Sequence, residues 1–182
     1  MERSIGMVEF SSIARGIYAA DQMVKISDVE IVTASSVCPG KYIAIVNGEV
    51  AAVKESVQKG TAEAGEFLVD SIIIPNVHPG VFPAIVGTAD PPEIDALGII
   101  ESYSLSAMVI AADAILKSAE LTAIELRLGT GLGGKAYFTF TGEVAAVNNG
   151  IEVGSKSLGD SGFLLNSEVI ASPSRKLIFS LY

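Results

Sequence analysis

The sequence predicts a two-domain α/β protein of the α+β kind. Each domain is a split βαβ, or ferredoxin-like, unit: an antiparallel sheet with helices on one face. Two observations carry this prediction. The string GEVAAV occurs at residues 48–53 and returns letter for letter at 142–147. The segments around both strings read strand, helix, strand, strand, helix, strand, so the chain is a tandem duplication.

Each copy opens with a short apolar strand, IGMVEF (5–10) in the first and LGIIES (97–102) in the second. A serine follows each strand, and Ser12 and Ser104 are the predicted N-caps of the first helix. Apolar residues at helical spacing predict one buried stripe on each of these helices. The stripe is Ile13, Ile17, Ala20 and Val24 in the first copy and, 92 residues later, Leu105, Val109, Ala112 and Leu116 in the second.

The second half of each copy is a hairpin, a helix and a last strand. The predicted strands are 29–35, 42–46 and 67–75, matched by 121–127, 136–140 and 163–171. The hairpin loops are VCPGK (37–41) and GTGLGGK (129–135), the second being two residues longer. GEVAAV begins the second helix, whose predicted inner face is Val50, Val53 and Val57, matched by Val144, Val147 and Ile151.

The stretch 77–93 contains four prolines and two glycines and is predicted to connect the two copies. The first domain is accordingly assigned to residues 1–86, the linker to 87–94 and the second domain to 95–182.

Composition excludes several classes of protein. The net charge of −9 argues against a nucleic-acid partner, because phosphates require a basic patch. No apolar run reaches the roughly 18 residues of a membrane span, and the N-terminus lacks the apolar core of a signal peptide. Hydrophobic residues make up 49% and charged residues 18% of the chain, which predicts an oligomer that buries apolar surface between subunits.

Cys38 is the only cysteine, which excludes an intrachain disulfide and fits a reducing compartment. A lone cysteine is most often a small buried hydrophobe. Here it precedes Pro39 and Gly40, and such turn sequences lie at the surface. The second copy has Thr130 at the matching place, so the fold does not require sulfur there.

Other candidate sites carry weaker signals. Gly129-x-Gly131-x-x-Gly134 matches the dinucleotide-binding fingerprint as a string, but a strand is predicted to follow it instead of the required helix. Its glycines are interpreted as allowing a tight loop. His78 is the only histidine and lies in the predicted connecting stretch. No base and nucleophile pair stands out, so an enzyme is not expected.

The GMVE and GIIE strand starts, the two AADxxxK helices, the glycine-bearing loops and the repeated GEVAAV resemble a bacterial microcompartment shell protein with two tandem shell (BMC) domains, of the trimeric class. The resemblance covers nearly the whole chain and is greatest to a shell protein of the propanediol-utilisation microcompartment. It implies a homotrimer that forms a pseudohexagonal tile with a central pore. It also implies a location in the shell of a polyhedral body in the bacterial cytoplasm, among other shell proteins in a mixed sheet.

In this family the hairpin loops line the pore, which implies pore positions at Val37, Cys38, Pro39 and Gly40 and at Gly129, Thr130, Gly131, Gly133 and Gly134. The resemblance further implies that Cys38 from each of three subunits binds one iron–sulfur cluster, 4Fe-4S, on the threefold axis. A single thiolate cannot hold a cluster, which usually takes four cysteine ligands. Three copies would supply thiolates to three irons, and the fourth iron would face solvent or another ligand. Zinc, bound by three thiolates and water, fits the same symmetry.

Lys25 and Lys117 match the family's edge lysine, which helps neighbouring tiles pack. The family often carries an arginine in the segment after the last strand, and the matching residues here lack it, being 75–78 (PNVH) and 171–174 (ASPS). The expected function is a shell tile that passes electrons or intact clusters across the shell, with an encapsulated redox enzyme as a further partner. The alternatives are a metabolite-conducting tile without metal and a trimeric small-molecule sensor.

Overall fold

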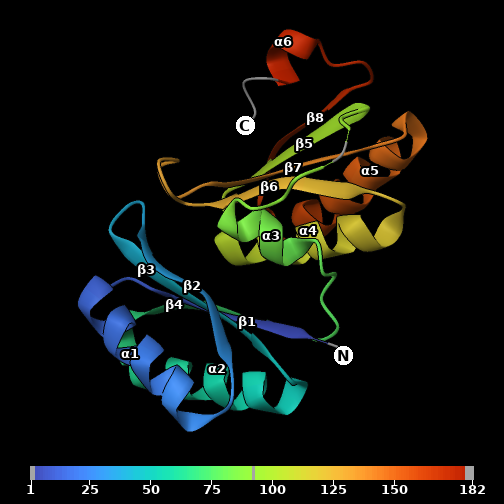
Figure 1. The fold of residues 1–182 in the computed structure, drawn as a ribbon. Helices are drawn as coiled ribbons and strands as arrows, with labels where there is room; N and C mark the ends of the chain where they lie inside the picture. Colours follow the sequence, from blue (N-terminus) through green and yellow to red (C-terminus); the bar gives the residue numbers. More distant parts are fainter. Residues whose placement is uncertain (1–2, 92, 179–182) are drawn as a thin grey trace. The chain divides into compact units, whose positions relative to one another are not determined.

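The computed structural model describes residues 3–91 and 93–178, which form two compact units (Figure 1). The first unit contains the described residues up to Pro79 together with Gly129–Gly134. The second contains Gly80–Leu128 and the described chain from Lys135 onward. No helix in these ranges is both long enough and apolar enough to cross a membrane.

The first unit has a four-stranded antiparallel sheet in the order β2-β3-β1-β4. Helices α1 and α2 lie together on one face of it (Figure 1). Its elements are β1 (Ser4–Phe10), α1 (Ile13–Ile26), β2 (Glu30–Val37), β3 (Lys41–Gly48), α2 (Val50–Ala64), the 3-10 turn η1 (Gly65–Phe67) and β4 (Leu68–Ile74).

The second unit repeats this architecture with the order β6-β7-β5-β8, again antiparallel throughout. Its elements are α3 (Val81–Val86), β5 (Ala96–Ser102), α4 (Leu105–Ser118), β6 (Thr122–Leu128), β7 (Ala136–Gly142), α5 (Val144–Asp160), β8 (Leu164–Ile170) and α6 (Arg175–Ile178). The fold predicted from the duplicated sequence is therefore confirmed in both copies.

A glycine at the same place in each first strand lets a neighbouring side chain approach the sheet closely. A Cβ added at Gly6 would lie 2.5 Å from a Val57 methyl on α2, and one at Gly98 would lie 2.5 Å from the Phe140 ring on β7. Both distances are shorter than a van der Waals contact. The glycine of the GMVE and GIIE strings thus serves core packing.

The predicted N-caps of the first helices are confirmed. Ser12 Oγ accepts a hydrogen bond from the Arg15 backbone N–H at 3.3 Å, and Ser104 Oγ accepts one from the Ala107 N–H at 3.2 Å. Each bond satisfies a donor that has no acceptor within the helix.

The predicted buried stripe holds for α4, but in α1 it holds at Ala20 and is wrong at Ile13 and Ile17. In the second copy Leu105, Val109, Ala112 and Leu116 are all buried. In the first copy Ile13 is 40% exposed and Ile17 54% exposed, and the buried residues of α1 are Gly16, Ala19, Ala20 and Met23. The first valine of each second helix, Val50 and Val144, is also exposed, because the core contacts begin one turn later at Val53 and Val147.

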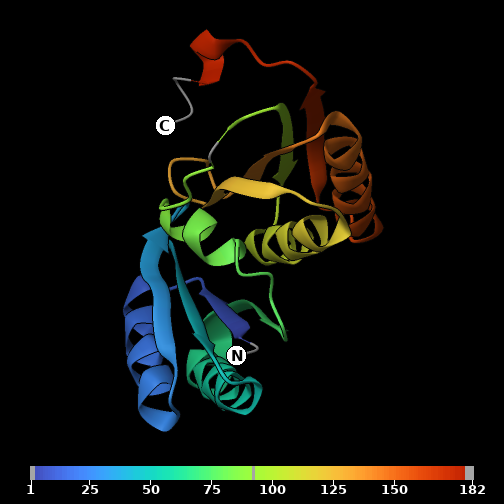
Figure 2. The same ribbon diagram turned by 45° about the vertical axis from the view of Figure 1, so that its right-hand side comes forward.

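Helix α3 occupies the proline-rich stretch that was predicted to be a connection. Its Pro83 lies in the first helical turn, where a missing N–H breaks no intrahelical bond. Helix α3 packs against β6 and also contacts α4 (Figure 2), and its Val81 and Ala84 are buried. These contacts place α3 in the second unit, whereas the sequence assigned residues up to 86 to the first domain.

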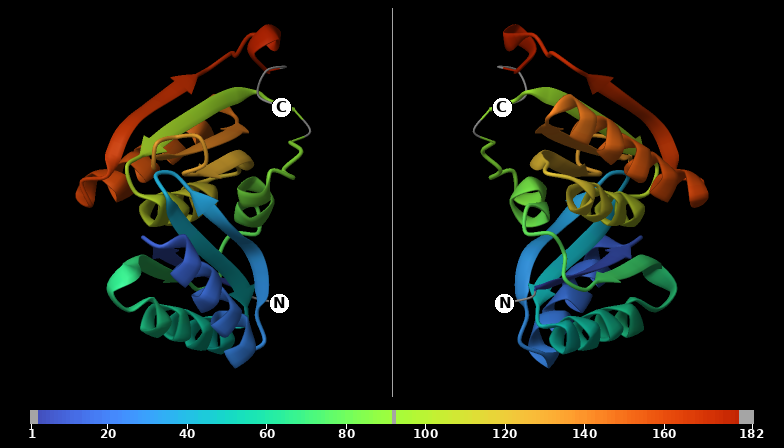
Figure 3. Two further views of the ribbon diagram at one scale, coloured as in Figure 1. Left: turned by 90° about the vertical axis from the view of Figure 1, so that its left-hand side faces the viewer. Right: turned by 90° about the vertical axis from the view of Figure 1, so that its right-hand side faces the viewer.

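Helix α6 follows the last strand in the same way that α3 follows β4. It extends from the end of β8 away from α4 and α5 (Figure 3). None of its four residues is buried.

Candidate functional site

The candidate site begins with the short loop between β2 and β3. Cys38 is half-buried, whereas Pro39 and Gly40 are exposed. The Cys38–Pro39 peptide bond is cis, and Gly40 has a φ of 78°, a left-handed conformation that favours glycine. The expected surface turn is therefore present, with the thiol at its start.

The matching loop between β6 and β7 is built on glycine. Gly129, Gly131, Gly133 and Gly134 all have φ between 63° and 91°, and the Leu132 N–H closes the loop on the Gly129 carbonyl. Strand β7 follows directly, so no helix N-terminus is present to receive a pyrophosphate. The glycines serve the loop's backbone conformation and not a dinucleotide site.

The structure brings these two loops together within the first unit. The Cys38 backbone N–H donates a hydrogen bond to the Gly129 carbonyl at 3.3 Å. Close packing adds to this bond, because a Cβ on Gly134 would lie 3.1 Å from Pro39 Cδ and 3.4 Å from the Cys38 carbonyl oxygen. The cysteine loop is thus held at its first residue by the glycine loop, a contact that sequence spacing does not reveal.

A lysine–glutamate ion pair lies at the base of each loop. Lys41, the first residue after the cysteine loop, pairs with Glu9 of β1, and Lys135 pairs with Glu101 of β5 at 3.1 Å. Glu9 is only 3% exposed, so the Lys41 ammonium compensates a buried carboxylate. Sequence analysis missed these pairs, although the lysine at the loop's end and the glutamate of GMVE and GIIE both repeat between the copies.

One chain offers a single thiolate for a metal. Among the residues that the structure describes, no group of three or more His, Cys, Asp or Glu side chains is arranged to bind a metal ion. His78 lies half-buried after β4 and belongs to no such group. Soft thiolate ligands suit zinc and iron–sulfur centres, so Cys38 fits such a centre only where further copies supply more sulfur.

Lys25 and Lys117 lie in the last turn of the first helix in each copy. Each forms an ion pair with the aspartate one turn earlier, Lys25 with Asp21 at 2.6 Å and Lys117 with Asp113 at 2.7 Å. The AADxxxK string therefore encodes an i,i+4 pair, and the Lys25 side chain is 65% exposed.

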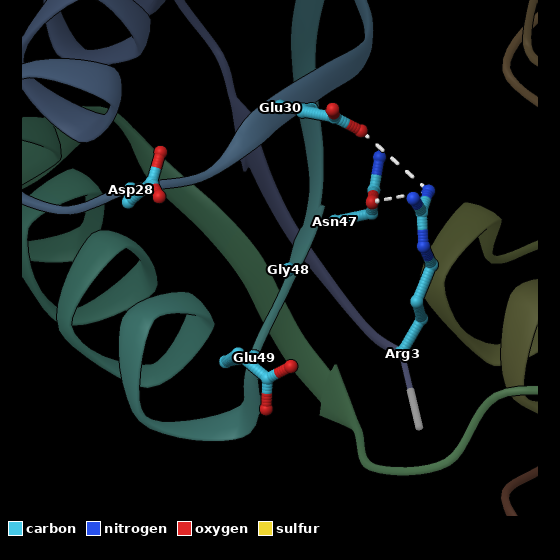
Figure 4. Close-up of a pocket in the computed structure, with 6 residues that line it drawn as sticks. All are labelled: Arg3, Asp28, Glu30, Asn47, Gly48 and Glu49. Atoms are coloured by element: carbon cyan, nitrogen blue, oxygen red, sulfur yellow. Dashed lines mark hydrogen bonds and ion pairs between the residues drawn. The ribbon is translucent and has the colours of Figure 1, made fainter. Parts of the chain in front are cut away.

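A polar pocket lies at the other end of the first sheet, lined by Arg3, Asp28, Glu30, Asn47, Gly48 and Glu49 (Figure 4). The Arg3 guanidinium points at the Asn47 amide oxygen, 3.2 Å away, and at Glu30, 3.5 Å away. The other two carboxylates make no contact with Arg3 in this view. Within this pocket the contacts join Arg3 to Asn47 and Glu30 only. Gly48 and Glu49 recur in the second copy as Gly142 and Glu143, whereas Arg3 and Asn47 do not, because Asp95 and Thr141 stand at their places.

The second sheet carries a cluster that the first copy lacks. The Tyr137 hydroxyl donates to a Glu125 carboxylate oxygen, and Arg127 pairs with the same carboxylate at 2.6 Å. Burial, together with this bond to an anion, raises the pKa of Tyr137 to about 12. The first copy has Ile43, Thr33 and Ser35 at the corresponding strand positions, so sequence repetition gave no sign of this cluster.

The comparisons with known proteins agree with this geometry. The BMC domain family matches residues 4–77 and again 96–173. The chain is 39% identical over 95% of its length, and 94% of the other's, to the bacterial microcompartment shell protein PduT of Citrobacter freundii. It is 34% identical to the carboxysome assembly protein CcmO of a Synechocystis species, over 84% of this chain and 56% of the relative.

A solved structure is similar over the whole chain. It is the crystal structure of a microcompartments protein from Desulfitobacterium hafniense, with 43% identity and a TM-score of 0.95 over 98% of this chain and 99% of that one. The family match over two ranges, a relative of nearly equal length and a solved structure of the same repeated fold all agree. The chain therefore belongs to the BMC domain family and is a structural shell protein of a bacterial microcompartment, similar to PduT.

Proposed function

We propose that this shell protein assembles as a homotrimer in which three Cys38 side chains hold one iron–sulfur cluster, 4Fe-4S, on the threefold axis. The observation that carries the proposal is the pairing of the two loops in one unit, with a half-buried cysteine in the shorter loop. A bound cluster supplies a one-electron redox centre. Such a tile passes electrons, or an intact cluster, across the shell and serves an encapsulated redox enzyme.

The chain's own residues position the sulfur. The hydrogen bond from the Cys38 backbone N–H to the Gly129 carbonyl fixes the start of the loop, and the half-buried Cys38 lies next to the exposed Pro39-Gly40 turn. Lys41 is already paired with Glu9, so its charge holds the sheet end together and is not free to balance a thiolate. Negative charge from three thiolates is then balanced by the metal.

The test is metal content after anaerobic reconstitution. The wild-type trimer should contain roughly four irons and four sulfides per three chains, with a broad visible absorbance that bleaches on reduction. Cys38→Ala should lose both while remaining trimeric, because its side chain contributes little to the packed domain. Thr130→Ala, at the matching place in the other loop, is the control and should keep full iron.

Three outcomes would contradict the cluster. Equal iron in wild type and Cys38→Ala would mean that Cys38 is not the ligand. Zinc without sulfide would identify a three-thiolate zinc site. A trimer with no metal under reducing, anaerobic conditions would support the metabolite-conducting tile instead.

We also propose that Lys25 and Lys117 lie at the tile edge and hold neighbouring tiles. Their ion pairs keep each lysine along its own helix near the last turn. The double variant Lys25→Glu/Lys117→Glu should stay trimeric but lose sheet formation in electron micrographs. Lys59→Glu is the matched control, because Lys59 forms the same kind of i,i+4 pair with Glu63 on α2. Sheets unchanged in the double variant would remove the lysines from tiling.

A further inference from the structure

We propose that the C-terminal segment, residues 173–178 with α6, packs against the α1–β2 face of a second copy of this chain. The α1–β2 face is defined by Ile13, Ile17 and Ile31, which are 40%, 54% and 51% exposed. The inference rests on the proposed homotrimer and names the surface that joins one chain to the next.

The second unit shows what such a face looks like when it is covered. The residues equivalent to Ile13, Ile17 and Ile31 are Leu105, Val109 and Ala123, which are 0%, 0% and 4% exposed. The helix that packs on this region is α3, which lies against β6 and contacts α4 (Figure 2). Among the described residues of the first unit, no helix takes this place beside α1 and β2.

Helix α3 and α6 are equivalent elements of the repeat. Val81 of α3 stands seven residues after the end of β4, and Leu177 of α6 stands seven residues after the end of β8. The apolar string VFPAIV at 81–86 corresponds to LIFSLY at 177–182. Val81 is fully buried, whereas Leu177 is 38% exposed.

The chain thus has a segment, α6, that covers no sheet or helix face, and a face, the α1–β2 face, that no segment covers. α3, the extension of the first copy, covers the second copy. By the same relation, α6, the extension of the second copy, covers the first copy of the next chain. Each chain then offers a segment at one end and a face at the other, a head-to-tail contact that closes into a ring if the rotation allows. Exposed apolar patches of this kind mark interaction surfaces.

The exposures in the second unit also predict which α1 residues remain exposed to solvent in the assembly. Tyr18 lies next to Ile17 on α1 and is 49% exposed. Its equivalent, Ile110, remains 42% exposed even though α3 is in place. In the assembly Ile13 and Ile17 should therefore become buried, while Tyr18 should not, which supplies an internal control on the same helix turn.

The first experiment measures assembly by mass in solution across a dilution series. Ile17→Asp should raise the dissociation constant of the assembly by roughly 100-fold or more, because it places a carboxylate in an apolar contact. Leu177→Asp should do the same, and Tyr18→Asp should change it less than about threefold. All three residues are exposed in the single chain, so circular dichroism should show folded protein in every variant.

The second experiment identifies the occupant by disulfide cross-linking in a Cys38→Ala background. Two differently tagged chains, one with Ile17→Cys and one with Leu177→Cys, are produced together and oxidised. A disulfide between the two tags is expected, and none is expected when Tyr18→Cys replaces Ile17→Cys. A single chain carrying both Ile17→Cys and Leu177→Cys should give covalently closed multimers on a non-reducing gel.

The outcomes separate this inference from the proposed function. Normal trimer formation by Ile17→Asp, together with no disulfide between the Ile17→Cys and Leu177→Cys chains, would overturn the segment's role and leave the trimer standing. A disulfide confined within one chain would overturn the second copy as occupant. A wild-type chain that stays monomeric at micromolar concentration would overturn the trimer and this inference together.

Discussion

Helices α1 and α4 are equivalent in sequence and in fold, yet they meet their surroundings differently. The outer stripe of α4 is buried, whereas the outer residues of α1 face solvent. Their own contacts with sheet and second helix are alike, and the difference is the additional contact of α4 with α3. The burial of these residues therefore depends on a neighbouring helix, α3, and not on the pattern of apolar residues along α1 or α4.

The largest expected effect compares one buried residue with its exposed equivalent. Leu105→Ala should lower the free energy of unfolding by about 3 kcal/mol, because it opens a cavity at a fully buried site. Ile13→Ala should cost less than about 1 kcal/mol in the free chain. Urea unfolding at a concentration where the mass is monomeric measures both.

If both variants lost the same free energy of unfolding in the monomer, the comparison of α1 with α4 would be wrong, because Ile13 would then be covered within its own chain. Urea unfolding of the assembled protein tests the comparison further. In the assembly, the loss of unfolding free energy from Ile13→Ala should approach that from Leu105→Ala.

A smaller effect compares glycines of the two loops. Gly40→Ala and Gly134→Ala both place a side chain at positive φ, which costs about 1 kcal/mol. A Cβ on Gly40 meets nothing within 4 Å, whereas one on Gly134 meets Pro39 and the Cys38 carbonyl. Gly134→Ala should therefore lower the urea midpoint more and also displace the cysteine loop, reducing bound iron. Equal midpoints and equal iron in the two variants would show that the loops do not support each other.

The smallest effect concerns pH and the cluster found only in the second copy. The pKa of Tyr137 is raised to about 12 in the folded chain, against about 10 in the unfolded chain. Between these values the unfolded chain releases a proton that the folded chain retains, so stability falls as the pH rises from 10 toward 12. The loss should be about 1 kcal/mol, since the side chain is partly exposed to solvent.

Tyr137→Phe should remove this slope, measured as the difference in urea midpoint between pH 9 and pH 11. Tyr42 provides the comparison in the first copy, because burial alone raises its pKa. A slope that persists in Tyr137→Phe would assign the effect to another group.

Much of the fold could be predicted because its signals are local. The strands, the serine caps and the duplicated helices each depend on residues a few positions apart, and Ser12 and Ser104 bond as expected. The Lys25–Asp21 pair could have been predicted from its i,i+4 spacing. Exposure of Ile13 and Ile17 could not, because it depends on where a distant proline-rich segment folds.

The candidate site was predicted in part. The turn at Cys38-Pro39-Gly40 and the glycine loop follow from local backbone preferences. The bond between Cys38 and Gly129 joins residues far apart in the chain, and the Tyr137–Glu125–Arg127 cluster has no counterpart in the first copy. Such contacts leave no periodic or spacing signal in a single sequence.

The two hairpins differ in loop length but not in the strands beneath them. Ser35 pairs with Ile43 below the short loop and Arg127 pairs with Tyr137 below the long one, and a lysine–glutamate pair secures each end. A few residues can therefore be exchanged at the tip without changing the register below. For engineering, a cysteine, a charged side chain or a longer glycine turn can be placed at a hairpin tip while the strand register below it is kept, provided that the contact between the two tips is preserved.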